Sequence, residues 1–297
     1  MKIVVTGSSG RVGQAVCVRL RRRHEVHGFD RAPASVTDTV ADIMNREALA
    51  RALRGAEAVV HAAALHAPHL PHVAASTFRR VNVEGTRAVA TACLEAGIRT
   101  LVFTSTTALY GAASTPADRA GWVTEETRPI PRTIYHRTKL AAESLLRQVA
   151  ASTPMRVTVL RMSRCFPEAA DLMAVYRLHR GVDARDVAAA HELALLSSGE
   201  PFRVFVVSGA TPFTPDEAAP LKSDAPGVLR RRAPALVAAF AARQWPLPAA
   251  IDRVYCAHRA QRELGWSPRF GCREVLRQHD AESPEVLPPT VGAPRTA

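Results

Sequence analysis

The chain has 297 residues, 47% of them hydrophobic, and its five scattered cysteines form no C-x-x-C pair, which excludes a disulfide framework and a zinc knuckle. The net charge of +12 comes mainly from arginines spread along the chain without interleaved aromatic residues, so we expect no nucleic-acid partner. No apolar run reaches the roughly 20 residues of a membrane span; Met1–Val5 begins a strand instead of a signal peptide, so we predict a cytoplasmic protein without a membrane partner.

Apolar strands alternate with helical patterns through the first 211 residues, which is typical of an α/β fold with a doubly wound parallel sheet of the Rossmann type. Strands are predicted at 3–6, 26–29, 58–62, 101–105, 156–161 and 203–207. Helices are predicted at 11–23, 46–53, 76–96, 135–150 and 184–196. Residues 111–132 are rich in Gly and Pro and are predicted to be a loop.

The first strand runs into the glycine-rich sequence GSSGRVG at 7–13, and a helix follows. Gly7 permits a tight turn, Gly10 lets the backbone approach a pyrophosphate, and Gly13 allows close packing of helix on strand. This pattern alone is weak evidence, because a glycine-rich turn needs no ligand. Asp30, however, ends the second strand, where a carboxylate accepts the adenosine ribose hydroxyls and repels a 2′-phosphate. We therefore predict NAD as the cofactor.

Two arginines keep NADP open as an alternative. Arg11 and Arg31 are both placed where a guanidinium meets a 2′-phosphate. Asp42 and Ile43 end the next short extended stretch and are predicted to hold the adenine edge. Alternatively, Asp42 only caps the helix that begins near Asn45.

Tyr135 and Lys139 are four residues apart at the start of a predicted helix, so they share one face of it. A nearby ammonium favours tyrosinate, which predicts a lowered pKa for Tyr135 and a role as general acid/base on a carbonyl or alcohol oxygen. Thr106 follows the strand at 101–105, and its hydroxyl is predicted to orient the substrate oxygen. The alternatives are an amphipathic surface tyrosine and a threonine without a catalytic role.

Three histidines recur at every third position, as His66, His69 and His72. On a helix this spacing suits a metal ion. Pro68 and Pro71 break any helix there, so we predict no metal site. We expect a substrate-facing loop in which one histidine binds a sugar hydroxyl.

Together these pieces resemble the short-chain dehydrogenase/reductase superfamily, in its extended branch of NAD-dependent epimerases and dehydratases. The resemblance implies a sheet of seven parallel strands, hydride transfer to or from a nicotinamide, and a catalytic triad of Thr106, Tyr135 and Lys139. The matching sequences are GSSGRVG at 7–13, Asp30, Asp42-Ile43, HAAA at 61–64, VNVEGT at 81–86, TSTTALYG at 104–111, YHRTK at 135–139, LR at 160–161, RGVDARDVAAAH at 180–191 and LGW at 264–266.

These motifs yield a set of predicted site residues. Those predicted to bind the cofactor are Gly7, Ser9, Gly10, Arg11, Val12, Gly13, Asp30, Arg31, Asp42, Ile43, Ala62, Ala63, Ala64, Asn82, Thr104, Tyr135, Lys139 and Met162. Those predicted to bind the substrate are His66, Thr106, Thr107, Ser163, Arg164 and Cys165. For Asn82 the resemblance also allows a structural role or a contact with the substrate lobe.

The stretch between Arg161 and Arg180 is much shorter than in sugar-nucleotide epimerases. Its sequence at 163–168 is similar to that of uronate dehydrogenases, which bind the substrate carboxylate with an arginine a few residues further on. Met173 stands at that place here, so Arg164 or Arg177 would have to make the contact. The Asp-Glu pair of dehydratases is replaced by Thr107-Ala108, which argues against dehydration.

We therefore divide the chain into a NAD-binding Rossmann domain at 1–211, with 161–182 contributing to the substrate pocket, a small substrate lobe at 212–277, and a disordered tail at 278–297. The favoured function is an NAD-dependent dehydrogenase acting on a secondary alcohol or lactol of a sugar-like small molecule. A nucleotide-sugar epimerase with tightly bound NAD and a non-catalytic dinucleotide sensor are the alternatives. We expect a homodimer that pairs the helices at about 76–96 and 135–150.

Overall fold

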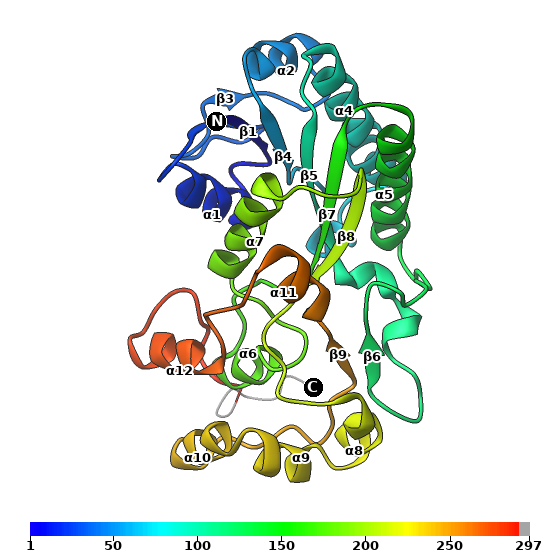
Figure 1. The fold of residues 1–297 in the computed structure, drawn as a ribbon. Helices are drawn as coiled ribbons and strands as arrows, with labels where there is room; N and C mark the ends of the chain where they lie inside the picture. Colours follow the sequence, from blue (N-terminus) through cyan, green and yellow to red (C-terminus); the bar gives the residue numbers. More distant parts are fainter. Residues whose placement is uncertain (291–297) are drawn as a thin grey trace.

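A computed structural model describes residues 1–290 of the chain, and its centre is one sheet of seven parallel strands in the order β3-β2-β1-β4-β5-β7-β8 (Figure 1). The strands are β1 (Lys2–Thr6), β2 (Glu25–Asp30), β3 (Thr39–Val40), β4 (Ala58–His61), β5 (Thr100–Thr106), β7 (Arg156–Met162) and β8 (Phe202–Val207). This confirms the predicted fold. The strand order reverses between β1 and β4, and such a switch point opens a crevice at the carboxyl ends of the strands.

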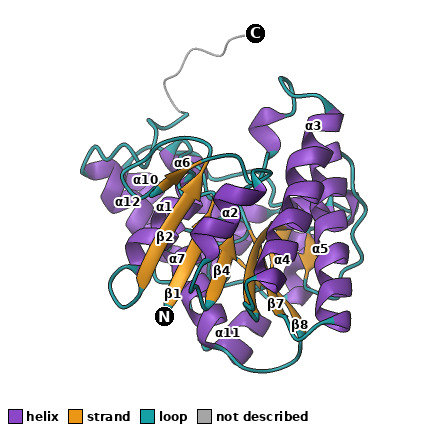
Figure 2. Ribbon diagram, turned by 90° about the horizontal axis from the view of Figure 1, so that it is seen from above, coloured by secondary structure: helices purple, strands orange, loops and turns teal. Residues whose placement is uncertain are grey.

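Helices cover both faces of the sheet, which is why its strands are almost continuously apolar (Figure 2). One face packs against α1 (Arg11–Leu20), α7 (Ala184–Leu196) and α11 (His258–Leu264). The other face packs against α2 (Arg46–Leu53), α4 (Gly85–Glu95) and α5 (Ile134–Ser152). No helix within residues 1–290 is long and apolar enough to cross a membrane.

The helix predicted at 76–96 is not uniform. It begins as α3 (Ala75–Arg79), passes through one π-helical stretch (Arg80–Glu84), and continues as α4. Such a π-helical insertion changes the direction of the side chains that follow it and is frequent near functional sites. Asn82 lies within this stretch, fully buried.

A smaller lobe lies beyond the carboxyl ends of the strands (Figure 1). Its helices are α6 (Ala170–Tyr176), α8 (Ala218–Ser223), α9 (Ala225–Arg232), α10 (Pro234–Ala242) and α12 (Cys272–Asp280). A separate hydrophobic core, which includes Phe213, Phe240 and Trp245, holds it together. The lobe therefore combines segments before and after residue 212.

Two strands of the lobe come from distant parts of the chain: β6 (Gly121–Val123) pairs in parallel with β9 (Arg253–Tyr255). The prediction of a loop throughout 111–132 is therefore wrong at β6. The partner strand lies far away in the sequence, so no local pattern reveals the pairing.

The prediction that disorder begins at residue 278 is wrong for residues 278–290, and residues 291–297 lie outside the described part of the chain. Residues 278–280 complete α12, and Val286 is buried in the lobe core. The Leu287 amide donates to the Glu168 carbonyl at 2.9 Å, and the Glu285 carboxylate pairs with Arg11. The proline-rich, polar composition of this stretch predicts a tail, whereas its packing on the lobe depends on tertiary contacts such as the burial of Val286.

Candidate active site

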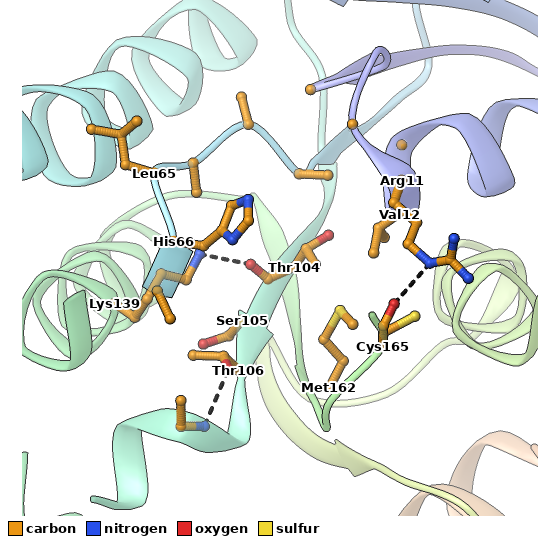
Figure 3. A pocket seen from close by; sticks show the side chains of 18 of the residues that line it. Arg11, Val12, Leu65, His66, Thr104, Ser105, Thr106, Lys139, Met162 and Cys165 are labelled. Atoms are coloured by element: carbon orange, nitrogen blue, oxygen red, sulfur yellow. Dashed lines mark hydrogen bonds between the residues drawn. The ribbon is translucent and has the colours of Figure 1, made fainter. Parts of the chain in front are cut away.

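The carboxyl ends of the strands surround a cavity of about 680 Å³, which the lobe closes on one side (Figure 3). Every predicted site residue except Asn82 lines this cavity, from the glycine-rich loop after β1 to Cys165 after β7. The cofactor and substrate residues predicted from separate motifs therefore meet in one place.

The loop between β1 and α1 has the geometry that its glycines predict. Gly7 has a positive φ of 79°, and a Cβ there would lie 2.4 Å from the Ala63 amide nitrogen. A Cβ at Gly13 would lie 1.9 Å from the Gly7 carbonyl oxygen, so helix and loop pack without space for a side chain. At Gly10 the nearest protein atom would be 3.4 Å away, which leaves that side of the backbone open to a phosphate.

A second observation fits a ligand bound in the cavity. Ser163 lines the cavity, and its buried hydroxyl has no hydrogen-bond partner within residues 1–290. A buried polar atom without a partner is costly, so a ligand that pairs with it is favoured.

Asp30 lies at the end of β2, where its two carboxylate oxygens accept the backbone N–H groups of Ser9 at 3.1 Å and Ala32 at 3.0 Å. These contacts hold the carboxylate at the cavity rim. The Arg11 guanidinium is engaged by other protein groups instead of facing Asp30. Its Nε donates to the Cys165 carbonyl at 2.8 Å (Figure 3), and its Nη2 pairs with Glu285. Of the two arginines that keep NADP open, only Arg31 is left in an exposed position.

Asp42 lines the cavity and does not cap α2. Its carboxylate accepts the Met44 N–H at 2.9 Å, whereas the Asn45 side chain accepts the Ala48 N–H and caps the helix. The capping alternative for Asp42 is therefore wrong. Ile43 beside it is buried and also reaches the cavity.

The three residues of the predicted triad face the cavity from two elements. Thr106 ends β5, where its hydroxyl oxygen accepts the Ala108 N–H at 3.1 Å. Tyr135 and Lys139 lie on the first turns of α5, which the Thr133 hydroxyl caps. The Lys139 ammonium donates to the Thr104 carbonyl at 2.7 Å, as Figure 3 shows.

The electrostatics of the pair differ from the sequence prediction. Burial raises the pKa of the Tyr135 phenol to about 12, and only the Thr106 hydroxyl acts to lower it. Burial also lowers the pKa of the Lys139 ammonium to about 7, while the Glu143 carboxylate acts to raise it. The prediction that Lys139 lowers the pKa of Tyr135 is therefore not met, because the ammonium points to the Thr104 carbonyl.

A buried ion pair fixes α5 against β5 and β7. The Glu143 carboxylate, one turn beyond the lysine, accepts the Arg161 Nη2–H at 2.7 Å and the Ser105 hydroxyl at 2.6 Å. Ser105 directly precedes the triad threonine, Thr106, at the end of β5. This network therefore sets the position of the catalytic helix relative to the strand.

Asn82 is the one predicted cofactor residue outside the cavity. Its side chain accepts the Leu65 N–H at 2.8 Å, donates to the Leu65 carbonyl at 2.9 Å and donates to the Thr138 hydroxyl at 3.1 Å. Asn82 thus joins the loop after β4 to α5, which is a structural role. The cofactor role and the contact with the substrate lobe are wrong, because the π-helical stretch aims the side chain inward.

His66 and Phe166 both line the cavity and contact one another. Their rings are stacked with centroids 5.6 Å apart, and Phe166 is one of the more exposed large apolar residues. Burial lowers the pKa of His66, so its ring is neutral near pH 7.

Cys165 is buried with a raised pKa of about 11, which suits a residue of the cavity wall and not a nucleophile. In the part of the chain that the structure describes, no three His, Cys, Asp or Glu side chains gather as a metal site.

The lobe contributes cavity residues that the sequence analysis missed: Tyr176, Arg180, Arg253 and Tyr255. Arg177 and Arg164, the two arginines predicted as alternative contacts for a substrate carboxylate, lie in different places. Arg177 is buried and pairs with Asp183 at 3.2 Å, outside the cavity, and the Arg164 guanidinium pairs with Glu168. Met173 belongs to the lobe core. Arg180 opens the RGVDARDVAAAH motif, a signal that was available, whereas Arg253 has no local signature.

A family model described as the NAD dependent epimerase/dehydratase family matches residues 3–208, which is more than half of the chain. The chain belongs to this family. NAD is the cofactor that the family uses, as the glycine-rich loop predicts. The predicted resemblance to the NAD-dependent epimerases and dehydratases is thereby confirmed.

Two curated relatives and one solved structure illustrate the range of the family. The chain is 36% identical over 115 residues to a 3-beta-hydroxysteroid dehydrogenase of Mycolicibacterium neoaurum, covering 35% of this chain and 31% of that protein. It is 28% identical over 204 residues to an uncharacterized UDP-glucose epimerase of Bacillus subtilis, covering 60% of this chain and 61% of that protein. A short-chain dehydrogenase/reductase superfamily protein of Agrobacterium tumefaciens, solved with bound NAD, shares the fold with a TM-score of 0.73 at 23% identity, covering 95% and 99% of the two chains. The chain thus spans less than two thirds of the length of these two curated relatives.

Proposed function

We propose that this protein is an NAD-dependent dehydrogenase that oxidises a secondary alcohol or lactol of a sugar-like small molecule, or reduces the corresponding carbonyl. One observation carries the proposal: Thr106, Tyr135 and Lys139 face the same cavity as the glycine-rich loop. Acid/base groups and a dinucleotide loop in one crevice are what hydride transfer at a C–O bond requires.

Each side chain of the triad has a distinct task in this proposal. NAD, when bound, supplies the hydride acceptor. In the reducing direction the neutral Tyr135 phenol donates its proton to the carbonyl oxygen of the substrate, and in the oxidising direction its tyrosinate form takes the hydroxyl proton of the substrate alcohol. The Thr106 oxygen accepts the Ala108 N–H, and in this proposal the Thr106 hydroxyl proton is the donor to the substrate oxygen. Lys139 holds the strand end through the Thr104 carbonyl, and its amine, whose pKa burial lowers to about 7, lies beside the site.

The preference for NAD over NADP rests on charge. The Asp30 carboxylate lies at the cavity rim and would repel a 2′-phosphate, and Arg11 is held by the Cys165 carbonyl and Glu285. Arg31 alone would have to compensate. We therefore propose that NADP is a poor cofactor.

A nucleotide-sugar epimerase is the second candidate, favoured by the similarity to the Bacillus subtilis UDP-glucose epimerase. The geometry supports the dehydrogenase better. One cavity of about 680 Å³ has to hold both dinucleotide and substrate, and the short stretch after β7 adds a single helix, α6, of seven residues. This arrangement favours a substrate of monosaccharide size. We further propose a homodimer formed through α4 and α5.

The test is an assay of the purified protein with NAD or NADP and a panel of sugars, uronates and cyclitols, followed by the absorbance of NADH. We expect NADH from at least one substrate with NAD, and a loss of kcat of about 10²–10⁴-fold in Tyr135→Phe, which lacks only the hydroxyl. Full activity in Tyr135→Phe would refute the proposed role. Interconversion of epimeric nucleotide sugars without net NADH would establish the epimerase. Tight NAD binding without turnover of any substrate would favour the non-catalytic sensor.

A further inference from the structure

The lobe side of the cavity carries two arginines that share a single carboxylate. Arg180 ends the turn that follows α6, four residues beyond Tyr176, and Arg253 lies on β9. The Arg180 Nη1 lies 3.6 Å from Asp252 Oδ1, and the Arg253 Nε donates to the same oxygen at 3.1 Å. Both arginines line the cavity.

The charges of this group do not cancel. Two guanidiniums face one carboxylate, which leaves one positive charge without a protein partner. The nearby His179 adds no further positive charge, because burial lowers the pKa of its ring to about 3 and keeps it neutral. An uncompensated charge at a cavity wall is stabilised by an anionic ligand.

Hydrogen-bonding capacity is also left over. The Nε atom of Arg180 is buried without a partner among residues 1–290. The guanidinium is stacked on the Tyr176 ring, 4.0 Å from its centroid, so its plane is fixed. A fixed planar guanidinium with unused donors matches the two oxygens of a carboxylate or phosphate. Asp252 holds the second guanidinium beside it, and the Ser114 hydroxyl accepts a further bond from Arg253 at 3.3 Å.

We propose that Arg180 and Arg253 form an anion subsite that binds the carboxylate or phosphate group of the substrate. This inference rests on the proposed function for the identity of the remaining substrate, and it narrows the sugar-like substrate to a sugar acid or a sugar phosphate. Arg164, which also lines the cavity, is not part of the subsite, because it pairs one to one with Glu168 and leaves no excess positive charge.

The experiment measures binding, separately from turnover. Hexuronates, hexose 6-phosphates and the neutral hexoses of matching configuration are titrated calorimetrically onto the protein, with and without saturating NADH. We expect at least one acidic sugar to bind about tenfold or more tightly than its neutral counterpart, since a charged hydrogen bond is worth about 1.5–3 kcal/mol. The ranking of carboxylates against phosphates identifies which group the subsite accepts.

Variants assign the preference to the subsite. Arg180→Gln and Arg253→Gln should each reduce the tenfold preference to about twofold or less, whereas Arg230→Gln, at an exposed arginine of the same lobe outside the cavity, should leave it unchanged. Thermal unfolding checks that each variant is folded, and Arg180→Lys and Arg253→Lys replace any that is not. The inference is overturned if neutral and acidic sugars bind equally, or if the Arg230 variant loses as much as the others.

The two proposals fail in different ways. If acidic sugars bind through the two arginines but no sugar reduces NAD, the anion subsite stands and the dehydrogenase is refuted. If neutral hexoses yield NADH with a KM that Arg180→Gln and Arg253→Gln leave unchanged, the dehydrogenase stands and the subsite is refuted.

Discussion

Thr104 holds the centre of the site through two different atoms. Its carbonyl accepts the Lys139 ammonium, and its hydroxyl lies 2.7 Å from the His191 Nε2. The His191 Nδ1 lies 2.8 Å from the Val187 carbonyl, which only accepts, so Nδ1 carries the proton. Burial lowers the pKa of His191 to about 4, so the ring is neutral and Nε2 accepts the Thr104 proton. The Thr104 oxygen therefore offers only lone pairs to the cavity.

This arrangement predicts that Thr104 and His191 act on NAD binding as one unit. Thr104→Val should weaken NAD binding about tenfold, since it removes one hydrogen-bond acceptor. His191→Phe should weaken it by a smaller factor, and should have no further effect in the Thr104→Val background. Calorimetric Kd values for the single and double variants provide the measurement. Additive losses of affinity in the double variant would contradict the coupling.

Sequence alone predicts the parts of the site that local spacing determines. The glycine loop, Asp30 and the Tyr135–Lys139 pair each lie within one strand, loop or helix turn, so their geometry follows from the local pattern. Arg253 and the inward turn of Asn82 depend on contacts between distant segments. The pKa of the tyrosine depends on burial, which a spacing of four residues does not reveal.

At the scale of elements, α5 serves two surfaces. Its inner face carries the catalytic pair and Glu143, all buried. Its outer face leaves Ala141 exposed, and beside it a hollow lies between α5 and the π-helical stretch. Apolar and charged residues both line this hollow: Arg79, Val83, Glu84, Ile134, Arg137, Thr138 and Ala141. Small residues on an exposed helix face permit close approach of a second helix, which supports the proposed dimer.

The dimer proposal predicts a mass of about twice 32.1 kDa in light scattering. Ala141→Arg should shift the protein to the monomer, because a long charged side chain keeps the paired helices apart. Ala241→Arg on α10 places the same side chain on an exposed position of the lobe and should leave the mass unchanged. A wild-type protein that is monomeric at all concentrations would remove the proposal.

Helix and strand positions in the Rossmann part follow from periodicity, because each element buries a continuous apolar face. The lobe is different. Its strand β6 has only three residues and its partner β9 lies far along the chain, so neither has a readable period. The predicted end of the helix at 76–96 agrees with the end of α4 at Glu95, but the π-helical interruption leaves no mark in the hydrophobic pattern.

For the whole molecule, buried neutral histidines predict sensitivity to acid. Burial lowers the pKa values of His61 and His179 to about 3 and of His191 to about 4. The unfolded chain takes up protons below about pH 6.5, whereas the folded chain does so only near pH 3–4. Their contribution to stability is therefore intact above pH 6.5 and is lost as the pH falls towards 3.

Urea unfolding at about pH 7 and about pH 5.5 measures this loss. Protonation of each histidine in the unfolded chain should lower the free energy of unfolding by about 1 kcal/mol over that interval, and the three together by about 3 kcal/mol. His179→Asn preserves a donor to the Arg253 carbonyl, which His179 Nδ1 contacts at 2.7 Å, and should reduce the pH dependence by about a third. An unchanged pH dependence in that variant would show that other groups cause the acid sensitivity.

The pairing of β6 with β9 also determines when the site is complete during synthesis. The dinucleotide loop and the triad are all present once residue 139 has left the ribosome, but Arg253 and the strand that carries it emerge far later. The residues of the glycine loop and the triad are therefore synthesised long before the proposed anion subsite is complete. Because Ala260, Leu264 and Trp266 are buried in the core on one face of the sheet, a nascent chain halted before β9 should also lack part of the packing that holds the dinucleotide loop.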